Sequence, residues 1–259
     1  MIIKNASSAH WYAKDGSPCY EVAYADPKKG MRRTTLRDAR KLNLVPSVTT
    51  ITKIIENPVL NTWKTNQAVM AALTMPSNKD ETELEFIKRL NVEANEVADK
   101  AAKWGTAIHY GVETYLTTGE IPSVLDGYDV GHAVQAFATW WEESGLVLSG
   151  LEKSFTSKLG YGGRSDIICT KAIVDIKTKE TKEGEAVIPY PDNGYQAVAY
   201  KQGMGLDDDV KCINVYLSRN EKDREAVAHT WDNEDELLEV FNCAFQLWKA
   251  IKKYDPVKG

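Results

Sequence analysis

Within residues 160–179, the segment 173–177 alternates between the two faces expected of a strand. Successive side chains of a β-strand point to opposite faces of the sheet, so Ile173, Asp175 and Lys177 share one face and the two apolar residues between them take the other. A strand that is otherwise apolar rarely carries an aspartate and a lysine without a use for them. Taken alone, however, Asp-x-Lys is common in strands, so the choice between a functional patch and an ordinary amphipathic strand depends on the other motifs of the chain.

Residues 165–169 and 172–177 predict a β-hairpin around a tight turn at Thr170-Lys171. In this register Asp166 faces Asp175, with the two β-carbons roughly 4.5–5.5 Å apart. Two such carboxylates repel each other unless a cation lies between them, and Mg²⁺ and Mn²⁺ prefer oxygen ligands. Thr-Lys is not an Asn-Gly type of turn, so the register follows from the pattern alone, and an ordinary amphipathic hairpin with one solvated face also fits it.

The rest of the chain alternates between helical and extended patterns. A small hairpin or irregular cap is expected in the first 35 residues, and Ser47 or Thr49 is a suitable N-cap for a short helix through Ile51. Further helices are expected at 67–104, with a break near Pro76, and at 129–144, 195–203 and 234–254. Further strands are expected at 146–157, 210–219 and 226–231.

Composition places the chain among ordinary globular proteins, with 43% hydrophobic and 27% charged residues. The net charge of −5 argues against a polycation that coats nucleic acid, although a local basic surface remains compatible with it. Residues 32–41 form one basic run, for which a solvated surface is the commoner explanation and phosphate contact the rarer one. The four cysteines are scattered, so we expect reduced thiols and no iron–sulphur cluster. No window approaches the ~18 apolar residues of a membrane span, so we expect a cytoplasmic protein with no membrane partner.

Several short motifs occur in a fixed order: G-T-x-x-H ending at His109, Asp166 after a glycine-rich turn, Asp175-Ile176-Lys177, and Gln196-x-x-x-Tyr200. In this order they resemble the catalytic core of the PD-(D/E)XK nuclease superfamily, in its RecB-like branch. The resemblance implies an α/β (α+β) fold with a restriction-endonuclease-like αβββαβ core, a mixed sheet flanked by helices and a helical N-terminal elaboration. Residues 104–259 would form the core and residues 1–103 a cap packed on it, as one integrated unit.

The resemblance also implies roles for individual residues. Asp166, Asp175, Lys177, Gln196 and Tyr200 would be catalytic. His109, Asp166, Asp175 and the backbone carbonyl of Ile176 would hold one or two Mg²⁺ or Mn²⁺ ions. Glu113 and Glu152 would border the metal site, although a solvated or paired surface carboxylate is an equally good explanation for each.

The segment P-S-V-T-T-I, followed by Leu60-x-x-Trp63, closely resembles the N-terminal signature of nucleases like the mitochondrial genome maintenance exonuclease and its phage relatives. This resemblance makes Ser47, Thr49, Thr50, Trp63 and Lys64 candidates for contact with a DNA strand. A base stacked on a tryptophan contributes about 1–3 kcal/mol regardless of sequence. A helix start and a packed core tryptophan are the simpler explanations for the same residues.

The resemblance implies a metal-dependent DNA exonuclease that prefers single-stranded DNA with a free end, and we expect a monomer. A flap or junction endonuclease and a non-catalytic nucleic-acid-binding module are the alternatives. A subunit that is active only with a recombination or replication partner is a weaker one.

Overall fold

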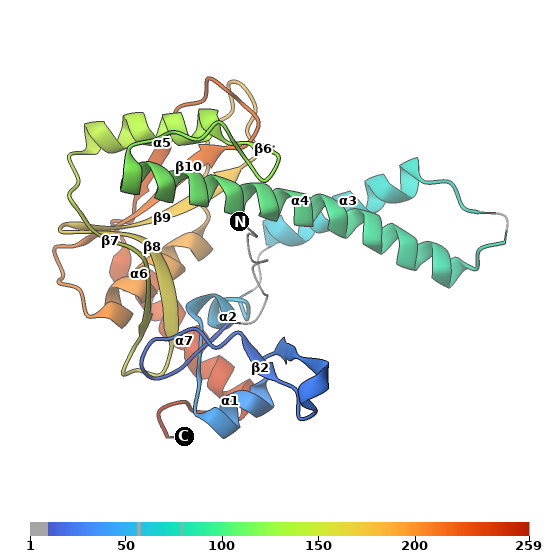
Figure 1. The fold of residues 1–259 in the computed structure, drawn as a ribbon, viewed down its shortest axis with the longest axis horizontal. Helices are drawn as coiled ribbons and strands as arrows, with labels where there is room; N and C mark the ends of the chain where they lie inside the picture. The colour runs from blue at the N-terminus through green and yellow to red at the C-terminus, as the bar shows by residue number, and fades with distance from the viewer. Residues whose placement is uncertain (1–9, 56–57, 79, 259) are drawn as a thin grey trace.

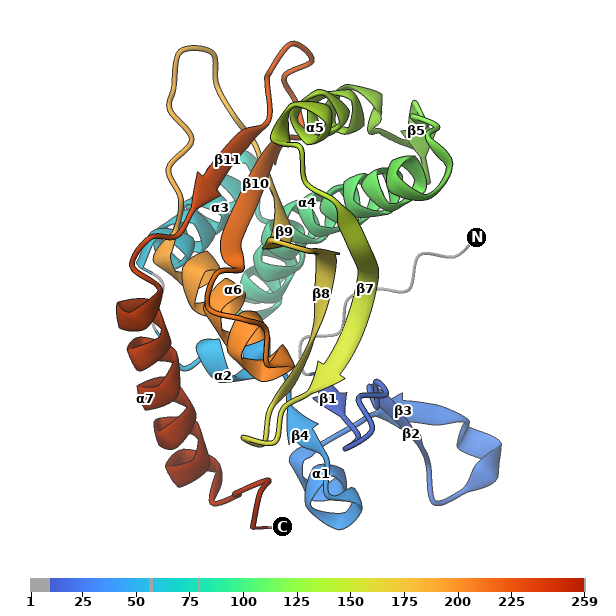
Figure 2. The ribbon, with the colours of Figure 1, turned by 90° about the vertical axis from the view of Figure 1, so that its left-hand side faces the viewer.

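A mixed five-stranded sheet forms the centre of the protein in the computed structural model, which describes residues 10–55, 58–78 and 80–258. Its strands are β7 (Leu148–Thr156), β8 (Gly162–Cys169), β9 (Ala172–Lys179), β10 (Lys211–Ser218) and β11 (Val227–Thr230). They lie in the order β11-β10-β9-β8-β7, as Figure 2 shows. β10 runs parallel to β9 and all other neighbours are antiparallel. The expected mixed α/β class is confirmed.

Helices cover both faces of this sheet. On one face, α4 (Glu83–Thr118) and α5 (Gly131–Ser144) pack their apolar residues on Ile167, Val174 and Val215. On the other face lie α6 (Pro191–Met204) and α7 (Glu234–Lys252), whose core includes Ile173. The chain passes from β9 to β10 through α6, because parallel neighbours need a long crossover rather than a tight turn.

The predicted β8–β9 hairpin forms, but its ladder is shorter than expected. Ile168 pairs with Ile173, and Ile167 pairs with Val174, as the pattern indicates. The ladder does not continue to the expected pairing of Asp166 with Asp175; the Asp166 carboxylate instead accepts a hydrogen bond from the backbone N–H of Ile176, at 2.9 Å. The predicted register is therefore confirmed, but the regular ladder ends before the two aspartates, because a side-chain hydrogen bond replaces the next backbone pair.

Helix α4 is one continuous element of 36 residues. A capping box formed by Thr82 and Glu85 fixes its start. Gly105 and Thr106 therefore lie inside the helix, which continues beyond the end expected at residue 104. The boundary expected between residues 103 and 104 falls within the same helix. α3 (Pro58–Thr74) packs beside α4, and this helical pair projects from the body (Figure 1).

The N-terminal part forms a small cap beside the sheet. It contains β1 (Trp11–Tyr12), β2 (Glu21–Ala23), the 3₁₀ turn η1 (Pro27–Lys29), β3 (Met31–Arg33), α1 (Leu36–Leu42), β4 (Val45–Pro46) and α2 (Val48–Thr52). A bridge from Ser47 to Gly162 joins this cap to the start of β8. A short hairpin of β5 (Val124–Leu125) and β6 (Tyr128–Asp129) precedes α5. Across the described chain, none of the helices has the length and apolar content that crossing a membrane requires.

Candidate active site

Strand β9 carries the charged pair at the centre of the site. Asp175 is 3% exposed, and its carboxylate lies 2.7 Å from the ammonium of Lys177. The two residues share one face of the strand because they are two positions apart. Each polar group therefore loses water and gains a partner of opposite charge.

Burial and mutual attraction act in opposite directions on this pair. Burial raises the pKa of the Asp175 carboxyl, and the positive charge of Lys177 opposes that rise. Burial lowers the pKa of Lys177, but the carboxylates of Asp175 and Asp166 outweigh it, so that the pKa of the amine is raised. Lys177 is therefore held as an ammonium ion at neutral pH.

A buried side-chain amide, that of Asn214, also holds the Asp175 carboxylate. Asn214 of β10 is fully buried and donates to Asp175 Oδ2 at 2.7 Å, and it accepts a hydrogen bond from Trp231 Nε1 at 2.6 Å. The sequence pattern predicts a strand at 210–219 but does not single out Asn214. The signal is the parallel register, which places Asn214 directly beside Asp175.

Helix α6 supplies the next two members of the hydrogen-bonded chain. Lys177 Nζ donates to Gln196 Oε1 at 2.8 Å, and Gln196 Nε2 donates to the hydroxyl of Tyr200 at 2.7 Å. Gln196 and Tyr200 lie one helical turn apart and so share a face. Tyr200 is 4% exposed, and burial raises the pKa of its phenol. The tyrosine is thus a neutral support for Gln196 and lies away from solvent.

Asp166 and His109 lie on the more accessible side of the pair. His109 Nδ1 is 3.4 Å from Asp166 Oδ2, and the two side chains are 32% and 16% exposed. α4 brings His109 close to the sheet because Gly105, one turn earlier, has no side chain. A β-carbon at Gly105 would lie 2.8 Å from Thr178 Oγ1 of β9. The glycine of the G-T-x-x-H motif therefore has a packing function.

Glu152 adds a further carboxylate from β7. Its backbone is left-handed, with φ of 47°, and its side chain pairs with Arg164 Nε at 2.8 Å. Burial and the nearby charge of Asp166 raise the pKa of Glu152 to about 7, with smaller contributions from Glu113 and Asp175. Negative charge accumulates here, and Arg164 offsets only part of it.

Carboxylate oxygens and an imidazole are ligands that Mg²⁺ and Mn²⁺ accept in proteins, so the chemistry of Asp166, Asp175 and His109 suits such an ion. Within the described parts of the chain, no group of three or more His, Cys, Asp or Glu side chains is already arranged around a common ion position. One oxygen of Asp175 is engaged by both Lys177 and Asn214.

The predicted DNA contacts are distributed over α2 and α3. Ser47 is 2% exposed and accepts the N–H of Thr50, so its hydroxyl serves as the N-cap of α2. The hydroxyl of Thr50 also accepts the N–H of His10. Thr49 and Lys64 present exposed side chains, and Trp63 is half-buried on α3. Of the five, Thr49 and Lys64 are the most accessible to a ligand.

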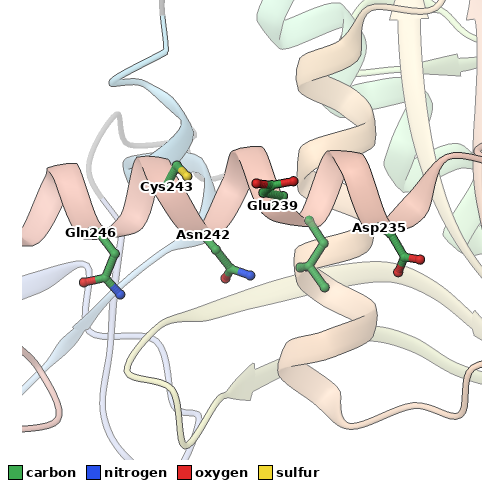
Figure 3. A pocket seen from close by; sticks show the side chains of 6 residues that line it. Asp235, Glu239, Asn242, Cys243 and Gln246 are labelled. Carbon is green, nitrogen blue, oxygen red and sulfur yellow. The ribbon is translucent and has the colours of Figure 1, made fainter.

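A shallow hollow lies elsewhere, along one face of α7 (Figure 3). Its lining comprises Asp235, Leu238, Glu239, Asn242, Cys243 and Gln246. None of these is a candidate residue of β8, β9 or α6. Of the other cysteines, Cys169 and Cys212 are buried and Cys19 is partly buried.

Comparison with known proteins adds little. No family model matches the chain, and no curated protein matches it. Among solved structures, the crystal structure of SSO0001 matches 78% of this chain and 95% of its own, at 14% identity and a TM-score of 0.30. So weak a likeness supports no inference about fold family or chemistry.

Proposed function

We propose that the protein is a metal-dependent nuclease that hydrolyses phosphodiester bonds, with single-stranded DNA that has a free end as its substrate. The observation that carries this proposal is the buried Asp175–Lys177 pair of β9, held by Asn214 and Gln196. The carboxylate of Asp166, on β8, accepts a hydrogen bond from the backbone N–H of Ile176, which lies between the two members of the pair. Asn214 and Gln196 each add a hydrogen bond to one member of the pair and hold both charges in one geometry. Preorganised charges of this kind are what stabilise a transition state.

The topology supports the same proposal. Helix α4, followed by the short β5–β6 hairpin and α5, precedes three antiparallel strands, and α6 leads to a fourth strand parallel to the third. With the hairpin and α5 counted as an insertion, this order agrees with the αβββαβ order expected for a restriction-endonuclease-like core. The candidate residues lie on its two central strands, on the first helix and on the crossover helix.

Each candidate residue would have a distinct role. Asp166, Asp175, His109 and the carbonyl of Ile176 would hold one or two Mg²⁺ or Mn²⁺ ions. When bound, such an ion lowers the pKa of a coordinated water and offsets negative charge on the reacting phosphate. Lys177 places a fixed ammonium beside the same phosphate, where it stabilises the charge that develops during attack.

The remaining residues position these groups. Gln196 holds Lys177 Nζ, and Tyr200 holds Gln196. Asn214 orients Asp175. Glu152, with its pKa near 7, borders the site and changes its charge within the neutral pH range.

The test is digestion of an end-labelled single-stranded oligonucleotide and of its covalently closed circle, each with Mg²⁺, with Mn²⁺ and with chelator. We expect metal-dependent loss of the linear strand while the circle survives. Cutting of the circle would show an endonuclease instead. Binding without cleavage of either substrate would contradict the enzymatic proposal and favour a binding module or a missing partner.

A further inference from the structure

Positive charge is concentrated in two segments that are far apart in the sequence. Residues 26–41 and 249–258 together contain eleven Lys and Arg against three Asp, a net charge of +8. The remaining residues contain 21 Lys and Arg against 34 Asp and Glu, a net charge of −13. The net charge of −5 is therefore the sum of a strongly basic part and a strongly acidic remainder.

The two segments form one surface. Arg40 of α1 donates to the carbonyl of Lys252 at 2.6 Å, at the end of α7. The Tyr254 hydroxyl donates to the carbonyl of Leu44 at 2.7 Å. Figures 1 and 2 both show α1 beside the C-terminal end of the chain. We call this surface, residues 26–41 with 249–258, the basic end.

Few of its charges are neutralised internally. Asp38 pairs with Arg32, and Asp255 pairs with Lys249. Among the described residues, no carboxylate lies within ion-pair distance of the exposed side chains Arg37, Lys41 and Lys252. These three cations face solvent.

Helix dipoles explain only a small part of this charge. The basic last turns of both α1 and α7 lie at the basic end, and each helix C-terminus carries about half a negative charge. Two such ends would offset about one of the eight excess positive charges. Moreover, Lys28, Lys29 and Arg33 belong to neither helix.

The basic end is connected to the candidate active site through a short path. Six residues lead from Lys41 to Ser47, which bridges to Gly162, and four more lead along β8 to Asp166. Since an extended chain spans at most about 3.6 Å per residue, the path is no longer than about 40 Å. A single strand stacked as in a duplex has one phosphate per ~3.4 Å and an extended strand has a wider spacing, so at most about twelve nucleotides cross that distance.

We propose that the basic end binds the phosphate backbone of the uncut part of a single-stranded nucleic acid whose terminus lies in the active site. This inference rests on the proposed function, because only a nuclease acting at a free end would hold the terminus of the nucleic acid in the active site. Recognition would be electrostatic and independent of sequence, because Arg and Lys contact phosphates rather than base edges. Substrates longer than about twelve nucleotides would bind more tightly than short ones.

The test compares a triple variant, Arg37→Gln with Lys41→Gln and Lys252→Gln, with the wild-type protein. Arg40 is left intact because it joins α1 to α7. The matched control is Lys171→Gln with Lys182→Gln and Lys222→Gln, whose side chains are 69%, 80% and 75% exposed outside the basic end. Thermal unfolding confirms that both variants are folded.

Binding of fluorescent oligothymidylates of 6 and 25 nucleotides is measured in chelator at several salt concentrations. We expect the triple variant to bind the 25-mer at least tenfold more weakly than the wild type does. The slope of log K against log salt concentration should decrease in magnitude by up to about 2, since each lost phosphate contact removes about 0.7. The 6-mer and the control variant should be unaffected.

Equal affinity and slope for the triple variant and the control would overturn the inference, as would equal weakening of the 6-mer and the 25-mer. Loss of binding to phosphatidylserine vesicles with oligonucleotide binding unchanged would also overturn it, in favour of a membrane surface. Because binding is read in chelator, it does not depend on cleavage. Length-dependent binding without cleavage under metal would defeat only the proposed function, and cleavage without a triple-variant effect would defeat only this inference.

Discussion

Asp175 has a more tightly determined environment than any other acidic residue of the candidate site. Its carboxylate lies against Lys177 and Asn214, and the side chain is 4% exposed. A buried ion pair often contributes little net stability, because desolvation offsets the attraction between the charges. The presence of such a pair is consistent with a role in function, and the surrounding hydrogen bonds keep it in one geometry.

Asn214→Ala should reduce both stability and cleavage. The substitution removes a partner from two buried groups, the Asp175 carboxylate and the Trp231 indole N–H. Each such loss costs about 1–3 kcal/mol, so we expect the free energy of unfolding in urea to fall by about 2 kcal/mol or more. Asn242→Ala, on the exposed face of α7 (Figure 3), is the control and should have little effect. Unchanged stability of Asn214→Ala would refute the positioning role.

Glu152→Gln should stabilise the protein at alkaline pH in the absence of metal. Its carboxyl has a pKa of about 7 in the folded protein against a reference value of 4.5. The folded state therefore binds this proton more tightly than the unfolded state, and stability is lost as pH rises from about 4.5 to about 7. The amide does not titrate, so the variant should exceed the wild type by up to about 3 kcal/mol at pH 8 and match it below pH 4.5.

Urea unfolding at pH 4 and pH 8 in chelator measures this difference. Glu185→Gln, whose side chain is 66% exposed, serves as the control and should show no difference that depends on pH. A Glu152→Gln variant that is less stable than the wild type at pH 8 would mean that the ion pair with Arg164 outweighs burial.

At the scale of elements, local patterns predicted more than spatial relations. The alternation in β9 predicted the shared face of Asp175 and Lys177, and the Gln196–Tyr200 spacing predicted their common helix face; the structure confirms both placements. The Asn214 contact depends on the register between β9 and β10, which are separated in the sequence by α6, so no local signal shows it. The predicted ladder of the β8–β9 hairpin is longer than the observed one, because the Asp166 side chain competes with the backbone as a hydrogen-bond acceptor.

Gly203→Ala should destabilise the protein although alanine favours helices. A β-carbon at this position of α6 would lie 2.4 Å from Phe155 Cε2 and 2.8 Å from Tyr161 Cε2. Overpacking of a core costs about 1–3 kcal/mol, which exceeds the gain of about 0.5–1 kcal/mol from helix propensity. We expect a lower urea midpoint; a midpoint at or above that of the wild type would show that the two rings move aside freely.

At the scale of the molecule, the sheet separates two cores, and α3 with the first half of α4 extends beyond both. Of the described side chains between residues 58 and 104, only Ala71 is buried. This pair projects from the body in Figure 1, and little buried apolar surface holds it. Its stability must therefore come mainly from the contact between the two helices.

Native-state hydrogen exchange should show this difference directly. Backbone amides of α3 and of residues 83–100 should exchange at least about a hundredfold faster than those of β8, β9 and β10, because local opening of the pair exposes few apolar contacts. Equal protection in the two regions would show that the helical pair is coupled to the core.

The central claim is that Asp166 and Asp175 form a hydrolytic site. The most direct test is to measure how fast the Asp166→Asn variant cleaves an end-labelled single-stranded oligonucleotide in the presence of Mg²⁺. The control is Asp126→Asn, in an exposed turn where φ is 48° and asparagine is well tolerated. We predict that Asp166→Asn, which keeps the shape and a hydrogen-bond acceptor, slows cleavage at least about a hundredfold. The control should cleave at the wild-type rate. Cleavage by Asp166→Asn at the rate of the control would contradict the assignment of this site.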